Sequence, residues 1–177
     1  MKNSLAQAEH DRRFLVFSRR FSRIPHLSSF LEGEIKLAGK EPTEGVCAVA
    51  GGGHKPTAAR ARRYAEEHHL SYVAVEDGFL RSLRLGCEGA DPLSLVVDHT
   101  GIYYDATGPS DLEHLLNREG WETPELMDSA QSALSSIIRY GLSKYNHAPE
   151  ADPEILGEGG TGAERVLLID QTAGDAS

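Results

Sequence analysis

The sequence lacks the features that mark several large classes of protein. No uninterrupted apolar run approaches the ~18 residues that a membrane-spanning helix needs, and we find no apolar segment followed by a small-residue cleavage site, as a secretory signal would have. Cysteine is scarce: Cys47 and Cys87 both lie outside any CxxC pair, so neither a disulfide framework nor a zinc site is expected. We therefore expect a cytoplasmic protein without a bound metal.

Positive charge is also scarce. The chain has 18 Lys and Arg against 27 Asp and Glu, a net charge of -9. Because nucleic-acid binding needs a basic face, we expect no nucleic-acid partner. The exception is the stretch 12–23, where five arginines stand among phenylalanines. It has two interpretations: contact with anionic lipid headgroups, or a first strand over Phe14–Phe17 with solvated arginines beside it, which we favour.

Length and composition indicate one ordinary globular domain. The 177 residues, 40% hydrophobic and 25% charged, suffice for a single core. We expect a disordered leader over residues 1–13 and an α/β domain over residues 14–177. Within that domain, residues 148–163 hold two prolines and four glycines, which predicts a flexible surface loop.

Short apolar runs that end in glycines or acids predict parallel strands. Val46–Ala50 and Tyr72–Val75 are expected to be strands on either side of a helix over Pro56–His69, which makes a βαβ unit. Val166–Ile169 is predicted as another buried strand. Ser28–Leu37 is compatible with a short helix interrupted at Gly33. The predicted fold class is therefore α/β, a parallel sheet with flanking helices.

The region after Tyr72–Val75 predicts a hairpin and two helices. Leu93–Val97 and Ile102–Tyr104 are expected to pair as strands across a tight turn in which Gly101 takes a positive φ. Ser110 is the expected N-cap of one helix, and Thr123-Pro124 begins a longer one. Apolar residues at helical spacing predict that both helices pack against the domain.

Acidic residues follow two of the predicted strands. Glu76 and Asp77 follow one, and the segment from Asp170 and Gln171 to Asp175 follows the other. Open α/β sheets bind ligands at the carboxyl ends of their strands, so the sequence predicts a two-carboxylate site at one edge. Asp105 is as compatible with a turn cap as with a ligand.

Cations and small polar residues accompany these acids. The loop Gly51–Gly53 leads into His54 and Lys55, which can bind sugar hydroxyls or a carboxylate. The loop matches neither GxGxxG nor GK[ST]. For Gly51 and Gly52, phosphate binding at free amides and close packing of the strand and loop remain equal alternatives. The further candidates for substrate binding are Gly53, Arg81, Ser82 and Lys144.

Several spaced blocks together resemble the capsular polysaccharide β-Kdo transferases of the KpsC, KpsS and LipA type. The blocks, which cover roughly Ser22–Ser177, are RIPHL, GHKPT, VEDGFLRS, PLSLVVD, GIYYDAT, SKYN and VLLIDQTAGDAS. The resemblance implies a Rossmann-like half of a GT-B-like glycosyltransferase in capsule polysaccharide biosynthesis and export. It also implies a retaining transfer of Kdo from CMP-Kdo to a lipid-linked Kdo or phosphatidylglycerol-type acceptor. No cofactor beyond the donor is implied, and peripheral association with the inner face of the inner membrane is compatible with it.

The resemblance also suggests roles for the acids. Asp175 is expected to be the nucleophile and Glu76 the acid or base, with Asp77 beside it, because they lie in the most specific matching blocks. Asp170 remains an alternative nucleophile, or it holds its own loop through hydrogen bonds. By resemblance, a carboxyl-terminal half that binds the donor follows such a domain and is absent here, so we expect no transfer by the 177-residue chain alone.

Two further interpretations remain open at the level of sequence. One is a module that binds an acidic glycan or glycolipid without chemistry. The other is a nucleotide-binding α/β domain of another class, which the glycine loop suggests.

Overall fold

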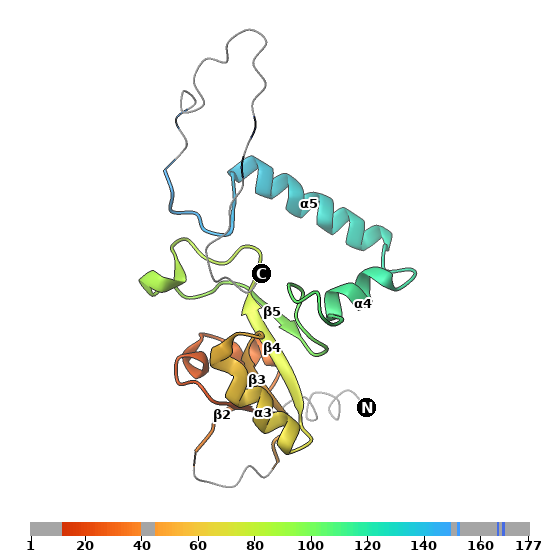
Figure 1. Ribbon diagram of the computed structural model, residues 1–177. Coiled ribbons are helices and arrows are strands. Elements are labelled where there is room, and N and C mark those ends of the chain that lie inside the picture. Colours follow the sequence, from red (N-terminus) through yellow and green to blue (C-terminus); the bar gives the residue numbers. More distant parts are fainter. Residues whose placement is uncertain (1–11, 40–44, 150–151, 153–165, 167, 169–177) are drawn as a thin grey trace, which may run out of the picture.

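The computed structural model describes residues 12–39, 45–149, 152, 166 and 168 of the chain (Figure 1). Their central feature is a five-stranded sheet in the order β2-β1-β3-β4-β5. Its strands are β1 (Arg13–Val16), β2 (Glu34–Leu37), β3 (Ala48–Gly52), β4 (Ser71–Asp77) and β5 (Leu95–Asp98). Neighbouring strands from β2 to β4 are parallel, and β5 is antiparallel to β4. The α/β fold class predicted from the sequence is confirmed.

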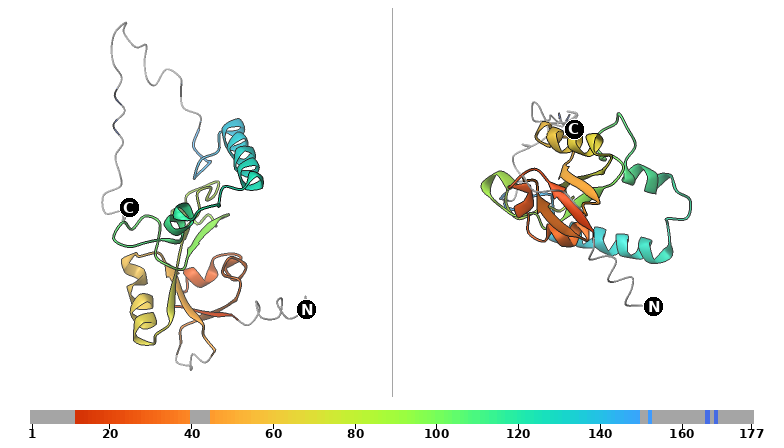
Figure 2. Two further views of the ribbon diagram at one scale, coloured as in Figure 1. Left: turned by 90° about the vertical axis from the view of Figure 1, so that its right-hand side faces the viewer. Right: turned by 90° about the horizontal axis from the view of Figure 1, so that it is seen from below.

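The middle strands β1, β3 and β4 are buried on both faces because helices cover both. On one face, α2 (Leu27–Leu31) packs on a cluster from β1, β3 and β4, which contains Phe14, Val16, Ala48, Ala50, Val73 and Val75. On the other face, Leu15 and Val49 meet Ala61 and Ala65 of α3 (Ala59–Glu67). Figure 2 shows α2 and α3 on opposite sides of the sheet. Alternate residues of each strand therefore point into different clusters, as the period of two in a strand requires.

The predicted βαβ unit is present with small shifts of its ends. The helix predicted to begin at Pro56 starts there as a 3-10 turn, η2 (Pro56–Ala58), and continues as α3. The predicted helix over Ser28–Leu37 is partly wrong, because α2 ends at Leu31 and Glu34–Leu37 pairs with β1 as strand β2. The turn between them is where Gly33 lies against the backbone of Arg12, which leaves no room for a side chain.

Two helices follow β5 where the sequence predicts them. They are α4 (Asp111–Asn117) and α5 (Pro124–Tyr140). Ser110 Oγ accepts a hydrogen bond from the amide of Glu113 at 3.1 Å, and Thr123 Oγ1 accepts one from Leu126 at 3.3 Å. These are N-caps that satisfy otherwise unpaired helix amides.

The predicted hairpin is wrong. Ile102–Tyr104 forms a turn rather than a strand, and Gly101 does not take a positive φ. The cause is Asp98, which is 1% exposed and whose carboxylate accepts hydrogen bonds from the amides of Thr100, Gly101 and Asp111. These bonds fold the chain around the end of β5 and toward α4, instead of back along the sheet.

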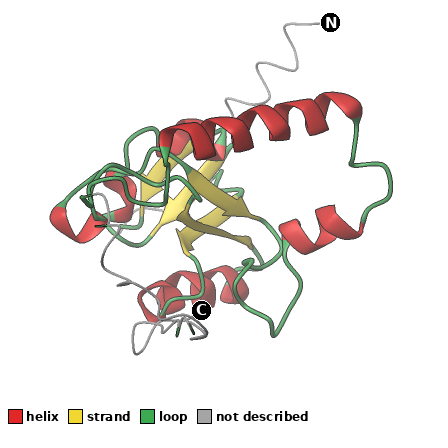
Figure 3. Ribbon diagram, turned by 90° about the horizontal axis from the view of Figure 1, so that it is seen from above, coloured by secondary structure: helices red, strands yellow, loops and turns green. Residues whose placement is uncertain are grey.

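The prediction that α4 and α5 pack through their apolar residues is also wrong for the described part of the chain. Neither helix contains a buried residue. Ile138 is 72% exposed, and Leu126, Met127 and Leu134 are about half exposed. In Figure 3 the two helices form an outer arm joined by a wide loop. None of the described helices is long and apolar enough to cross a bilayer.

The predicted last strand is described only at Val166 and Leu168. Both are almost fully exposed and outside any strand, so the prediction of a buried strand is wrong at these two positions. No described strand pairs with them, and an apolar run is buried only where a neighbouring strand and a second layer cover it.

Candidate active site at the carboxyl end of the parallel strands

A pocket of about 330 Å³ lies where β1, β3 and β4 end. It is bounded by the loop after β1, by the loop that joins β3 to η2 and by the end of β4. Lys55, Glu76, Asp77 and Arg81, all predicted from the sequence, line it. Gly53, His54 and Ser82 adjoin these residues in the chain, whereas Asp170, Gln171 and Asp175 lie outside the described residues. Part of the predicted site is therefore assembled at one edge of the sheet, as parallel strands require.

Glu76 is held by Lys55. Lys55 Nζ donates to Glu76 Oε1 at 2.9 Å, and the amide of Asp77 donates to the same oxygen at 3.2 Å. Partial burial alone lowers the pKa of Lys55, but the hydrogen bond and negative charge of Glu76 outweigh this and raise the pKa above its ordinary value. Glu76 Oε2 is buried and has no hydrogen-bond partner among the described residues. A buried acceptor without a partner is costly, and a catalytic role is one of the explanations for such a group.

Asp77 is held by Arg81 through an ion pair and not a hydrogen bond, because Arg81 Nε has no hydrogen-bond partner among the described residues. Arg81 Nε lies 3.0 Å from Asp77 Oδ2, and Arg81 Nη1 donates to Ser82 Oγ at 2.8 Å and to the carbonyl of Ala90 at 2.7 Å. Arg81 is only 7% exposed. Although it lines the pocket, its contacts make it a support for Asp77 and the following loop. Ser82 has a similar structural contact, since its hydroxyl donates to the carbonyl of Arg84 at 2.6 Å.

The glycine loop is closely packed. Gly53 has a φ of +49°, and a side chain there would meet the Tyr104 hydroxyl and Glu76 Oε2. Its carbonyl accepts a hydrogen bond from Tyr72 Oη at 2.8 Å, and burial raises the pKa of Tyr72 to about 12. A side chain at Gly51 would collide with the same tyrosine. Close packing, one of the two alternatives for Gly51 and Gly52, is thus what the structure shows at Gly51 but not at Gly52, where an added side chain would meet nothing within 4 Å.

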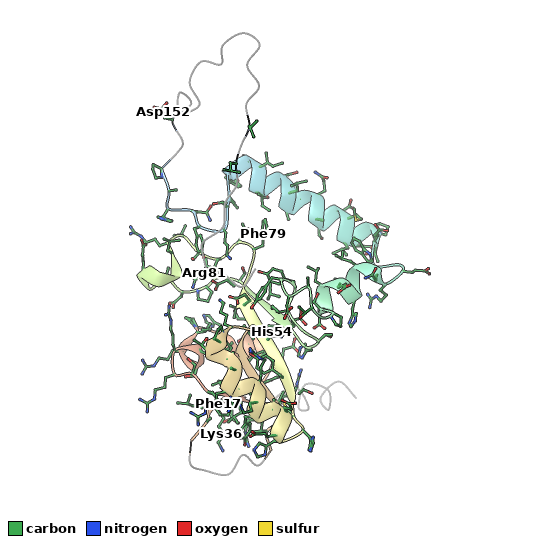
Figure 4. All side chains as sticks on the ribbon, in the orientation of Figure 1. Phe17, Lys36, His54, Phe79, Arg81 and Asp152 are labelled. Carbon is green, nitrogen blue, oxygen red and sulfur yellow. The ribbon has the colours of Figure 1, made fainter. Side chains whose placement is uncertain are left out.

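His54 is oriented by the segment after β5. Its backbone amide donates to Tyr104 Oη at 3.0 Å, and its Nδ1 lies 2.5 Å from Asp105 Oδ2. The pKa of Asp105 falls to about 2, first because the Thr107 hydroxyl donates to it and then because of the hydrogen bond with His54. Asp105 therefore both caps its own turn and anchors His54. Figure 4 shows His54 and Arg81 near the end of β4.

Lys144 does not line the 330 Å³ pocket. It lines a second, mostly apolar groove of about 750 Å³ between β5, α4 and α5, where Phe79 is 79% exposed. The backbone carbonyl of Lys144 accepts hydrogen bonds from the amides of Arg81 and Ser82, and Ser82 pairs with Tyr145 in a parallel bridge. The FLRS and SKYN segments, far apart in sequence, are therefore neighbours in the fold.

Sequence reasoning missed two residues of this region. Tyr104 accepts a hydrogen bond from the amide of His54 and so supports that loop. Its position in the block GIYYDAT was the sequence feature that could have indicated this role. Arg20 lines the pocket from the loop after β1. It was visible only as one of several arginines in a basic stretch, which gave no indication of where it would lie.

Comparison with known proteins gives consistent results. A family model described as capsule polysaccharide biosynthesis protein matches residues 47–160. The capsule polysaccharide modification protein LipA of Neisseria meningitidis serogroup B is 47% identical over 159 residues, which are 89% of this chain and 22% of LipA. The lipopolysaccharide-processing protein LpsZ of Rhizobium meliloti is 42% identical over 118 residues, 66% of this chain and 26% of LpsZ. The chain thus spans about a quarter or less of these curated relatives.

A solved structure is similar over nearly the whole chain. It is a chain of Thermosulfurimonas dismutans KpsC, named beta Kdo 2,4 transferase, with a TM-score of 0.84 and 52% sequence identity. The similarity covers 96% of this chain and 52% of the KpsC chain.

Proposed function

This chain belongs to the capsule polysaccharide biosynthesis family, and we propose that it forms part of a retaining β-Kdo glycosyltransferase that uses CMP-Kdo as its donor. The observation that carries the proposal is the 52% identity and TM-score of 0.84 with a chain named beta Kdo 2,4 transferase. The acceptor is a lipid-linked Kdo or a phosphatidylglycerol-type lipid, met in the cytoplasm at the inner face of the membrane. The proposal involves no metal and no cofactor.

The pocket offers one of the groups that such chemistry needs, Glu76, and we propose Asp175, which lies outside the described residues, as the other. Retaining glycosyl transfer uses one carboxylate as nucleophile and a second group as acid or base. In the first step, an Asp175 carboxylate oxygen bonds to the anomeric carbon of Kdo, while CMP leaves with the bonding electron pair. In the second step, the acceptor hydroxyl oxygen displaces Asp175, and Glu76 takes the hydroxyl proton. The position of Glu76 in the pocket lining supports this second role, and its buried Oε2 is not committed to another described residue.

A chimera tests the proposal directly. This chain replaces the matching half of the KpsC chain, and Kdo transfer from CMP-Kdo to a Kdo-terminated acceptor is followed by mass spectrometry. Glu76→Gln is expected to lower kcat by about a hundredfold or more, since general acid–base catalysis contributes that much. Glu66→Gln, an exposed residue of α3, is the matched control and should leave kcat unchanged.

Transfer at the unsubstituted rate by the Glu76→Gln chimera would contradict the role of Glu76. If the unsubstituted chimera folds but transfers no Kdo, the transferase proposal fails, and a non-catalytic glycan-binding module becomes the better explanation.

A further inference from the structure

The cations around the 330 Å³ pocket differ in how they are paired. Lys55 is paired with Glu76 and Arg81 with Asp77. Arg20 lines the same pocket, and its Nη2 donates only to the backbone carbonyl of Gly86, at 3.3 Å. Among the described residues that line the pocket, Arg20 is the cation without a carboxylate partner. The lining side chains thus comprise three cations and two carboxylates, and the excess positive charge belongs to Arg20.

Arg20 also has a suitable environment for a ligand. It is exposed and lies in the turn before η1 (Phe21–Arg23), directly after β1. Phe17, Phe21 and Ile24, from the same segment, provide an apolar wall of the pocket beside it. A planar guanidinium can bind a carboxylate or a phosphate through two parallel hydrogen bonds.

Of the four basic residues expected from sequence to bind an acidic substrate, three are paired with carboxylates, and the fourth, Lys144, does not line this pocket. His54 is bound to Asp105, Lys55 to Glu76 and Arg81 to Asp77. Among the described cationic side chains that line the pocket, Arg20 is the one that an oxyanion can bind without competing with a carboxylate, because its bond of 3.3 Å is to a neutral carbonyl.

We propose that Arg20 is the oxyanion-binding residue of this pocket. The inference rests on the proposed function and deepens it. In that function the oxyanion is either the carboxylate of the sugar acid or the phosphate of the donor, which share the same chemistry toward a guanidinium. The apolar wall next to Arg20 contacts the uncharged part of the same ligand.

The test is a titration of the 177-residue chain, followed through its backbone amide resonances. The probes are free Kdo, CMP, inorganic phosphate and, as a neutral sugar, mannose. Arg20→Ala is expected to raise the Kd for the anionic probes by about tenfold or more, because a charge-assisted bidentate contact is lost. Arg20→Lys retains the charge without the planar fork and should be intermediate. The response to mannose should be the same for the unsubstituted chain and for both Arg20 variants.

Arg63→Ala is the matched control. Arg63 is an exposed arginine of α3 that does not line the pocket. Its loss changes the net charge by the same amount as Arg20→Ala but should alter each Kd less than twofold. If Kdo binding weakens in Arg20→Ala but CMP and phosphate binding do not, the oxyanion is the sugar carboxylate. If CMP and phosphate binding weaken but Kdo binding does not, the oxyanion is a phosphate.

Two results would overturn the inference: equal Kd values for Arg20→Ala and Arg63→Ala, or no saturable shift of pocket amides in the unsubstituted chain with any anionic probe. Failure of the proposed function has a different signature. In that case Arg20→Ala loses anion binding while the unsubstituted chimera folds but transfers no Kdo.

Discussion

Gly53 determines the shape of the candidate site at the level of a single residue. Its positive φ turns the chain from β3 toward His54, and its lack of a side chain lets the Tyr104 hydroxyl and Glu76 approach. A residue with a Cβ would be strained in this backbone conformation and would also displace both neighbours. Gly53 therefore shapes the loop that carries His54 and also leaves space for the carboxylate of Glu76.

We predict that Gly53→Ala destabilises the protein by about 1–3 kcal/mol, through backbone strain and displacement of Tyr104. Urea denaturation measures the change. Gly52→Ala is the matched control, because Gly52 has nothing within 4 Å of an added Cβ and should be close to neutral. Equal losses for the two variants would show that Gly53 is not under special constraint.

At the level of elements, Asp98 joins β5 to α4. Its buried carboxylate accepts three backbone amides from the turn and from the first residue of α4. Asp111 strengthens the same junction, since its carboxylate accepts the amide of His99 at 2.7 Å and the hydroxyl of Thr100. The turn is therefore built by side-chain hydrogen bonds instead of strand pairing.

We predict that Asp98→Ala costs about 3 kcal/mol of unfolding free energy, because it leaves amides without partners in a buried place. Asp91→Ala, at an exposed position, should change stability by less than about 0.5 kcal/mol. Thermal and urea unfolding of both variants provide the measurement. A loss for Asp98→Ala no greater than for Asp91→Ala would mean that the turn forms without the carboxylate.

At the scale of the whole molecule, stability is concentrated in one part of the described chain. The largest fully buried side chains come mostly from β1, β3 and β4, which have helices on both faces. α4 and α5 contribute no buried residue. Regions with few buried apolar contacts open at low free-energy cost.

We predict that amide hydrogen exchange separates these two parts. Amides of β3 and β4 should exchange only through global unfolding, whereas those of α5 should have protection factors at least about a hundredfold lower. Mass spectrometry of exchanged peptides distinguishes the two segments. Equal protection of α5 and β3 in the 177-residue chain would contradict this picture and would mean that the apolar face of α5 is covered in solution.

The sequence by itself determined the parts of this protein that depend on local pattern. Apolar runs placed Glu76 and Asp77 at a strand end, and Ser110 and Thr123 were recognisable as caps. The spaced blocks indicated the family, which the comparisons confirm. Such signals arise from residues close together in the chain, or from motifs that stand in order along it.

Only the tertiary structure decided which groups meet. Three ion pairs depend on side-chain distances between separate elements or across a turn. They are Lys55–Glu76, Arg81–Asp77 and His54–Asp105. The same holds for Asp98, whose buried carboxylate turned a predicted hairpin into a helix junction. Charge types can be read from a sequence, but the pairs Lys55–Glu76 and His54–Asp105 cannot, because the packing of distant segments brings them together. Among the described residues that line the pocket, this pairing leaves Arg20 as the cation without a carboxylate partner.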